Sequence, residues 1–303
     1  MLDVVATSAF HIPLKDDEDL YDLSGDLQKY CRDRPRRIDR FTQLCLTGSG
    51  RCIQQLQNTN YNIDTDTGLY IGSRFAALSN TINVHKQMMQ CGQIPKPAHF
   101  INTLSNSAGY YVARNLGLTG KNLFVSRAGF STEAVLQTAI LDIQSQQTAQ
   151  ALIGIVDEGV VPLSHHRQRL GLAPDTPISE GSYWLLAKKS SSGNQRAEGV
   201  LATITDTLTF CDSNNLQNWL KEPTDNNSQA QYYSKTLTQS ELNQRFSIMS
   251  DSMQFWENLA ADGTSSTASV LLNFITSKTW PTLITINGDE DGRYHVSRTV
   301  VYT

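Results

Sequence analysis

The sequence has few cysteines that could cross-link it and no long apolar run that could anchor it in a membrane. It has 5 cysteines in 303 residues, an odd number without the spacing of a zinc site. This excludes a disulfide framework and indicates reduced, partly buried thiols in a cytoplasmic protein. No apolar run approaches membrane-spanning length, and no basic segment precedes an apolar stretch at the N-terminus. We therefore expect a cytoplasmic chain without a membrane partner.

The sequence also lacks an excess of positive charge. Lys and Arg number 25 against 29 Asp and Glu, which gives a net charge of −4. A nucleic-acid surface needs clustered Lys and Arg, so a nucleic-acid partner is excluded. The one basic cluster runs from Arg32 to Arg40 and is interleaved with Asp33 and Asp39. It predicts an ion-paired helix start, with an acidic protein partner as the alternative.

Histidine is scarce, with 6 in the chain. His165 and His166 are adjacent, so their side chains point in different directions, and no third metal ligand stands nearby; this predicts a polar loop. Asp157 and Glu158 follow an apolar run and are expected to cap a turn instead of forming a catalytic pair. We expect neither a metal nor a cofactor bound to this chain.

Strands and helices alternate along the chain, which predicts the α/β class. The unbroken apolar runs 123–126 and 151–156, joined by a helical stretch, predict parallel strands buried on both faces. With 39% hydrophobic residues the chain can bury a large core. The expected strands are 4–10, 68–72, 123–126, 151–156, 181–187, 199–205, 282–287 and 295–302, and the expected helices are 38–56, 76–91, 107–116, 132–147, 237–246 and 264–277.

Two local patterns give more specific predictions. The strands 181–187 and 199–205 flank a Ser-rich turn and predict a hairpin. The Gly48-Ser49-Gly50 segment follows a helical stretch and lacks the Gly-Lys-Ser/Thr ending of a phosphate loop. It is therefore expected to end the helix.

The segment from Leu123 to Ala134 predicts a buried strand that turns sharply into a helix. Such an elbow presents a nucleophile at the positive end of a helix dipole. A cysteine there would be a reactive thiolate. Here the turn offers Gly129 between Ala128 and Phe130, so it presents no thiol.

Several segments, in this order and spacing, resemble the β-ketoacyl synthase family, the condensing enzymes of the thiolase fold. The resemblance implies a layered α-β-α-β-α thiolase-like fold with a shortened second half. It implies one domain over 1–303, with a first half of about 1–189 and a reduced second half of about 190–303. The segments that carry it are Arg37-Ile38-Asp39-Arg40-Phe41-Thr42, residues 100–109 (Phe-Ile-Asn-Thr-Leu-Ser-Asn-Ser-Ala-Gly), Leu116-Gly117-Leu118-Thr119-Gly120, Ile155-Val156-Asp157-Glu158 and residues 178–186 (Ile-Ser-Glu-Gly-Ser-Tyr-Trp-Leu-Leu).

The same resemblance implies that this chain lacks the catalytic residues of the family. A working ketosynthase uses a cysteine to carry the acyl chain and two histidines to assist. The cysteine position falls on Gly129 or Ala128, and the region 206–280, where the first histidine is expected, contains none. The second falls on His295 or, with a shift of one, on Tyr294. The resemblance therefore implies no catalytic residue and a chain length factor of a type II polyketide system, aryl polyene or aromatic.

Such a factor pairs with a catalytic ketosynthase and shapes its acyl tunnel, while the substrate arrives on the phosphopantetheine of an acyl carrier protein. The resemblance implies that 123–127 pairs with the partner's equivalent strand and that 97–107 lies against the partner's pocket. The residues it assigns to the tunnel or the interface are His99, Phe100, Asn102, Thr103, Asn106, Tyr110, Tyr111, Leu123, Phe124, Val125, Ser126, Arg127 and Phe130.

Two other interpretations remain open at this point. One is a divergent thiolase-fold enzyme, such as a decarboxylase, which would use His99 or His295 with a bound water. The other is a structural homodimer without a polyketide role.

Overall fold

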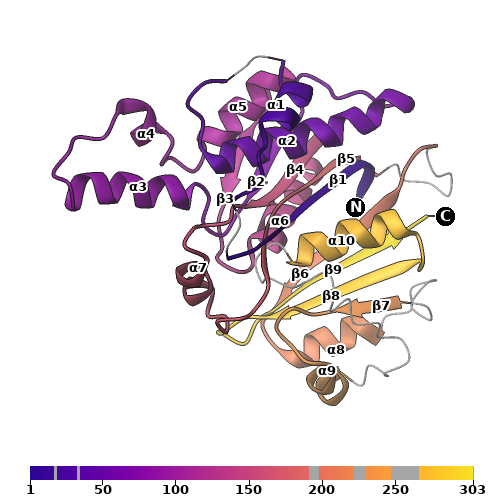
Figure 1. The fold of residues 1–303 in the computed structure, drawn as a ribbon. Coiled ribbons are helices and arrows are strands. Elements are labelled where there is room, and N and C mark those ends of the chain that lie inside the picture. The colour runs from indigo at the N-terminus through magenta and orange to yellow at the C-terminus, as the bar shows by residue number, and fades with distance from the viewer. Residues whose placement is uncertain (17–18, 33–34, 191–197, 222–229, 247–265, 303) are drawn as a thin grey trace.

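The computed structural model describes residues 1–16, 19–32, 35–190, 198–221, 230–246 and 266–302 (Figure 1). The strands are β1 (Leu2–Leu14), β2 (Gly68–Gly72), β3 (Asn122–Val125), β4 (Gln150–Asp157), β5 (Ile178–Lys189), β6 (Ala202–Phe210), β7 (Ala230–Tyr233), β8 (Thr282–Gly288) and β9 (Tyr294–Val301). The helices are α1 (Ser24–Tyr30), α2 (Arg40–Gln54), α3 (Leu78–Met89), α4 (Pro97–Ile101), α5 (Ser107–Leu116), α6 (Ser131–Gln144), α7 (Leu163–Leu170), α8 (Ser213–Lys221), α9 (Gln239–Phe246) and α10 (Ser266–Ser277).

The strands follow one another in the order β3-β2-β4-β5-β1-β6-β9-β8-β7. Counted outward from the centre of the sheet, the strands of the first half follow the order β1, β5, β4, β2, β3. The strands of the second half follow the order β6, β9, β8, β7. The directions repeat as well, since β5 and β9 are antiparallel to both of their neighbours while β2–β4 and β7–β8 are parallel. The two halves are therefore two versions of one topology, and among the described residues the second has no counterpart of β3.

The halves join where β1 meets β6, through the three residue pairs from Leu2↔Ile204 to Val4↔Ala202. Helices α6 and α10 lie between the strands of the two halves, as Figure 1 shows, and their apolar side chains share one buried cluster with both. Helices α2 and α5 cover the outer face of the first half, and α8 and α9 cover that of the second. This gives five layers in the order α, β, α, β, α.

The central helices owe their position to their sequences. Helix α6 buries Val135, Leu136, Ala139 and Ile143, which recur at helical spacing. Helix α10 is apolar around most of its surface, with four residues from Val270 to Phe274 at 1% exposure or less. A helix that is apolar on nearly all sides is stable only between two layers.

Two sequence predictions about the sheet and its covering helix are wrong. Strands β5 and β6 do not form a hairpin, because β1 lies between them and pairs with both. Gly48 does not end a helix but lies inside α2. A Cβ on Gly48 would come within 2.2 Å of Ser182 Oγ and 2.5 Å of Trp184 Cδ1, so glycine is required there by close helix–sheet packing.

Two predictions about polar segments also need correction. His165 and His166 lie in α7, and His166 is buried with its ring against Phe75. The basic cluster does not form a helix start as a whole, because α2 begins only at Arg40. Asp39 caps α2 by accepting a hydrogen bond from the amide of Thr42 at 2.8 Å.

Helices α3 and α4 stand away from the layered body (Figure 1). We call residues 78–106 the arm. Within the part of the chain that the structure describes, no helix is long and apolar enough to cross a membrane.

Candidate functional site

The predicted elbow lies between β3 and α6. Ala128 stands at its tip with φ of 44°, a left-handed conformation that alanine seldom adopts, and its side chain is exposed. The buried hydroxyl of Ser131 shapes the turn, because it accepts a hydrogen bond from the amide of Arg127 at 3.0 Å and lies 2.9 Å from the carbonyl oxygen of Ala128. Gly129 does not have a positive φ, and a Cβ there would meet open space. Ala128 is therefore the residue that the turn presents.

A lysine from the second half is bound to this turn. The ammonium group of Lys235, whose side chain is 7% exposed, donates to the carbonyl oxygen of Gly129 and lies 3.4 Å from Glu133 Oε1. It also sits 4.8 Å from the centre of the Phe130 ring, a cation–π distance. Lys235 follows β7, so the first turn of α6 is tied to the opposite half of the molecule.

Glu133 is the buried centre of this contact, at 2% exposure. Its Oε1 accepts hydrogen bonds from Asn287 Nδ2 at 2.7 Å and from Thr267 Oγ1 at 3.2 Å. Asn287 in turn accepts from the amide of Lys235 at 2.8 Å. A buried carboxylate needs such a cation and such donors to be tolerated.

His295 reaches the elbow from β9, and its ring packs on Phe130 with 4.8 Å between ring centres. Its Nε2 lies 3.1 Å from Asp289 Oδ2 and its Nδ1 lies 3.0 Å from Thr209 Oγ1. Burial lowers the pKa of His295 despite the neighbouring carboxylate. The ring is fully buried with both nitrogens engaged, so it is held as a structural element and has no free nitrogen to offer a substrate.

Asp289 supplies the negative charge that faces His295 and the neighbouring arginines. Burial alone would raise the pKa of Asp289, but hydrogen bonds from Arg293 and His295 outweigh it and hold the pKa at about 2. Arg127 of the elbow also approaches Asp289, at 3.8 Å. Tyr294 points elsewhere, into the cluster under α9, where its hydroxyl bonds Arg245 at 3.2 Å. Of the two residues considered for the second histidine position, only His295 contacts the elbow.

The strand that leads into the elbow is the edge of the sheet. β3 pairs with β2 on one side, and no strand of the described residues pairs with it on the other. Leu123, Phe124 and Val125 are half-buried, and the Phe124 ring packs on Phe41 with 6.3 Å between ring centres. Ser126 is exposed, and its hydroxyl donates to the carbonyl oxygen of Arg74 at 3.2 Å. An exposed edge of this kind is a template for pairing with another strand.

The remaining predicted site residues form a separate group on the arm and α5. Asn102 is buried and donates to the carbonyl oxygen of Arg37 at 2.8 Å, and Asn80 donates to the carbonyl oxygen of His99 at 2.7 Å. Thr103 closes the end of α4 by donating to the carbonyl oxygen of Phe100 at 2.7 Å. Asn106 precedes α5 without capping it through its side chain, and the rings of Tyr110 and Tyr111 meet edge to face at 5.4 Å.

Large apolar side chains are exposed along the arm and on α5. Ile94 is 95% exposed, the highest value among them. Helix α5, which carries Tyr110, packs against β3, the free edge of the sheet. Several large apolar side chains left exposed in one stretch of chain are typical of an interaction site. The side chains are Met88, Met89, Ile94, Phe100, Ile101, Leu104 and Tyr110.

The pair Asp157 and Glu158 supports the base of the arm. Asp157 Oδ1 accepts from the Ser73 hydroxyl and the Arg74 amide, both at 2.9 Å. Glu158 is 3% exposed, and its Oε1 accepts from the amide of Ser79 at 2.6 Å, in the first turn of α3. Burial, together with the charges of Asp39 and Glu180, raises the pKa of Glu158 to about 8. The two carboxyls thus cap local turns, as the sequence indicated.

No cluster of metal-ligating side chains occurs among the described residues. Sequence reasoning missed Lys235, Asn287 and Thr267, which come to the elbow from the other half. Lys235 stands in a polar stretch after a short strand, where nothing local distinguishes it from a surface lysine.

The family model described as "Beta-ketoacyl synthase, N-terminal domain" matches residues 19–202 of this chain. That span contains β2 to β5, α2 to α7 and the whole elbow. The chain belongs to the β-ketoacyl synthase family. Among curated protein sequences, none matches significantly.

Solved structures of β-ketoacyl synthase relatives share the fold at low identity. "The ishigamide ketosynthase/chain length factor" aligns with a TM-score of 0.76 at 16% identity, covering 100% of this chain and 99% of that one. A type II polyketide acyl carrier protein complex with its ketosynthase, AntDE:AntF, aligns with a TM-score of 0.76 at 14% identity, covering 99% of both chains. The complex of the ketosynthase ApeO with its chain length factor ApeC from Xenorhabdus doucetiae aligns with a TM-score of 0.55 at 10% identity, covering 98% of both. The thiolase-like fold predicted from the sequence is confirmed.

Proposed function

We propose that this member of the β-ketoacyl synthase family is a non-catalytic chain length factor that pairs with a catalytic ketosynthase. The observation that carries the proposal is the free edge of β3 leading into an elbow whose tip is Ala128. A methyl group cannot be acylated, so the elbow keeps the shape of a nucleophile turn without the nucleophile. The resemblance to solved ketosynthase and chain length factor complexes supports the same assignment.

The surface of the first half supports a heterodimer. The β3 edge offers unpaired backbone groups from Asn122 to Val125, and the arm beside it exposes apolar side chains. Strand pairing supplies direction and register, while apolar burial supplies most of the free energy of association. A chain that hides neither surface by itself gains stability from a partner that covers both.

The contacts at the elbow weigh against the alternative of a divergent enzyme. His295 is fully buried, and both of its ring nitrogens have partners within 3.1 Å. His99 stands on α4 in the arm, separate from the elbow group. Neither histidine of that alternative therefore presents a free ring nitrogen at the turn.

We assign the arm to the wall of the partner's acyl tunnel. His99 and Phe100 lie in α4, and the Phe100 side chain is 57% exposed in the free chain. In the heterodimer their bulk would limit the length of the product, because forcing additional methylenes into a packed wall costs about 1–3 kcal/mol. The substrate would arrive on an acyl carrier protein, and this subunit would need no cofactor of its own. The pathway is of the type II polyketide class, aryl polyene or aromatic.

The first test is co-expression with a cognate ketosynthase that retains its cysteine. We expect a stable one-to-one complex by size-exclusion chromatography with light scattering, and aggregation of this chain when it is expressed alone. Intact-mass spectrometry of the complex after incubation with acyl-loaded carrier protein should place the acyl group on the ketosynthase only. Covalent loading of this chain in the absence of a partner would refute the proposal, and a stable homodimer without affinity for a ketosynthase would support the structural-homodimer interpretation.

The second test concerns product length. Phe100→Ala or His99→Ala in the complex should shift the products to longer chains, measured by mass spectrometry of the extracted products. Leu208→Ala is the matched control, because Leu208 is 38% exposed in β6, outside both the arm and the β3 edge. An unchanged product at full activity would remove the tunnel-wall role and leave the pairing intact.

A further inference from the structure

Helix α4 carries both proposed wall residues, His99 and Phe100, but packing does little to hold it in place. All five of its residues are partly or fully exposed. A helix this short is not stable through its own backbone hydrogen bonds. A pocket of about 410 Å³ lies between α4 and the segment that carries Arg37, with lining residues from both. The position of α4 therefore depends on specific bonds to its neighbours.

Asn80 binds α4 to the longer helix of the arm. It stands in the first turn of α3, and its Nδ2 donates to the carbonyl oxygen of His99 at 2.7 Å. Carbonyl groups near the C-terminal end of a helix have no partner within the helix. The bond therefore satisfies the end of α4 and also fixes the backbone of one wall residue.

Asn102 binds the other end of α4 to the layered body. It follows α4 directly and is 4% exposed, and its Nδ2 donates to the carbonyl oxygen of Arg37 at 2.8 Å. A buried amide group without a partner is costly, so burial of Asn102 requires this bond. The carbonyl of Phe100, by contrast, accepts from the nearby Thr103 hydroxyl and adds no link to another element.

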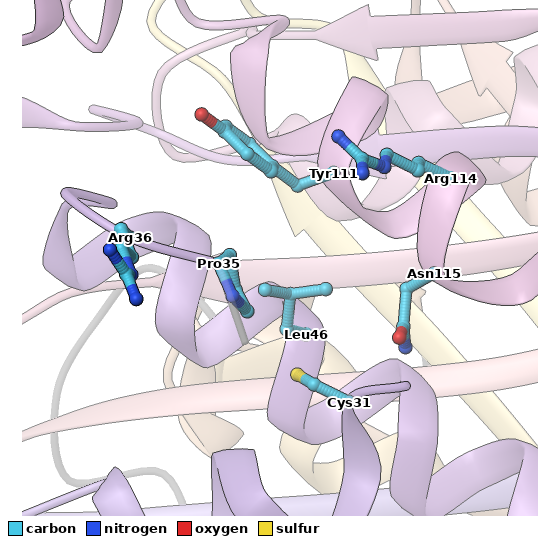
Figure 2. A pocket seen from close by; sticks show the side chains of 7 residues that line it. All are labelled: Cys31, Pro35, Arg36, Leu46, Tyr111, Arg114 and Asn115. Carbon is cyan, nitrogen blue, oxygen red and sulfur yellow. The ribbon is translucent and has the colours of Figure 1, made fainter. Parts of the chain in front are cut away.

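The acceptor of the second bond lies in a segment that is itself held in place. Arg37 has a φ of 60°, and a residue with a side chain keeps this strained conformation where its surroundings impose it. The next two residues attach the segment to α2, because Ile38 packs against the cluster under α2 and Asp39 caps the helix. Pro35 lines a pocket together with Leu46 of α2, as Figure 2 shows.

We propose that Asn80 and Asn102 position His99 and Phe100 in the wall of the partner's acyl tunnel and thereby set the length of the product. The inference rests on the proposed function, in which these two bulky side chains limit the chain. Both asparagines are positioning residues, because their amide groups hold backbone carbonyls and act on the product through α4. Asn102, which the family resemblance assigns to the tunnel or the interface, has this supporting role because its side chain is buried.

The test exchanges only the donating NH₂ group, by Asn80→Asp and Asn102→Asp, in the complex with the cognate ketosynthase. An aspartate in the first turn of α3 is favoured by the helix dipole, so Asn80→Asp leaves α3 intact. Each variant should broaden the distribution of product lengths, measured by mass spectrometry of the extracted products. The ratio of the main product to its neighbours should fall about 2- to 10-fold, the change in populations that one lost hydrogen bond produces. Phe100→Ala differs, because it should shift the products to longer chains.

Asn115→Asp is the matched control. Asn115 is a buried asparagine of α5 whose Nδ2 donates to the carbonyl oxygen of Tyr30 at 3.1 Å, so the same kind of donor is lost away from α4 (Figure 2). It should leave the product lengths unchanged. In a His99→Ala, Phe100→Ala background, Asn102→Asp should add no further change, because the side chains that it positions are gone.

Hydrogen exchange of the complex, followed by mass spectrometry, supplies a second readout. The backbone amides of residues 97–104 should exchange faster in Asn102→Asp by a similar factor, while those of β4 should keep their natural rates. A natural product distribution in both asparagine variants, while Phe100→Ala lengthens the product, would overturn this inference and leave the proposed function intact. Further broadening in the His99→Ala, Phe100→Ala background would also overturn it. An unchanged product in Phe100→Ala would remove the wall role itself, and this inference with it.

Discussion

Glu158 makes the stability of this protein depend on pH in a direction opposite to that of most carboxyls. The pKa of Glu158 rises from its ordinary value of 4.5 to about 8 in the folded chain, chiefly because burial disfavours the charged form. Below pH 4.5 the group is protonated in both the folded and the unfolded chain. Between that pH and about 8 the unfolded chain loses the proton first, so the free energy of unfolding falls as the pH rises.

The size of the effect follows from the same values. A tenfold change in proton affinity corresponds to about 1.4 kcal/mol, so complete ionisation withdraws on the order of 4–5 kcal/mol. Glu158→Gln keeps an oxygen acceptor for the Ser79 amide and cannot ionise. We expect the variant to be close to the natural protein in stability near pH 5 and more stable by several kcal/mol at pH 9.

The assay is urea unfolding followed by circular dichroism at a series of pH values. Glu290→Gln is the matched control, because Glu290 is exposed in the β8–β9 turn, and its pH profile should follow that of the natural protein. A Glu158→Gln profile parallel to that of the natural protein from pH 5 to pH 9 would refute the reasoning. It would mean that the carboxylate is ionised at no cost in the folded chain.

Three further changes probe the elbow and the core. Lys235→Met should lower the free energy of unfolding by about 3–5 kcal/mol, because it leaves Glu133 buried without a cation, and adding Glu133→Gln should recover much of the loss in chemical denaturation. Ala128→Cys should be alkylated by iodoacetamide faster than the exposed native thiols, since the start of α6 favours a thiolate, and equal rates would contradict this. Gly48→Ala should destabilise by about 1–3 kcal/mol through overpacking, while Gly25→Ala, where a Cβ meets nothing within 4 Å, should be neutral or stabilising in thermal melts.

Local patterns predicted most of the elements, because their signals lie within a few residues. β2 and α5 have the predicted bounds, and α5 ends at Gly117, whose φ is 73°. The hairpin of β5 and β6 was wrong because pairing is not local, and the strand that separates them is the first in the chain. An apolar run predicts that a strand is buried, but it does not predict which strands lie next to it in the sheet.

The candidate site likewise has one part that the sequence predicts and one part that it does not. The turn and its missing thiol are contiguous in sequence and were predicted from it. Lys235, Asn287 and Thr267 meet Glu133 only after the two halves close on α6, at sequence separations of 102, 154 and 134 residues. No sequence periodicity connects positions so far apart. A lysine followed by threonine and leucine is typical of an ordinary loop.

The left-handed backbone of Ala128 has a consequence for the proposed role of this surface. A Cβ in that conformation costs roughly 1–2 kcal/mol, which glycine would avoid. A chain that only needed to connect β3 to α6 would relax the bend. Under the proposed pairing, the cost of the bend is offset by the shape that it gives to the surface beside the free edge of β3.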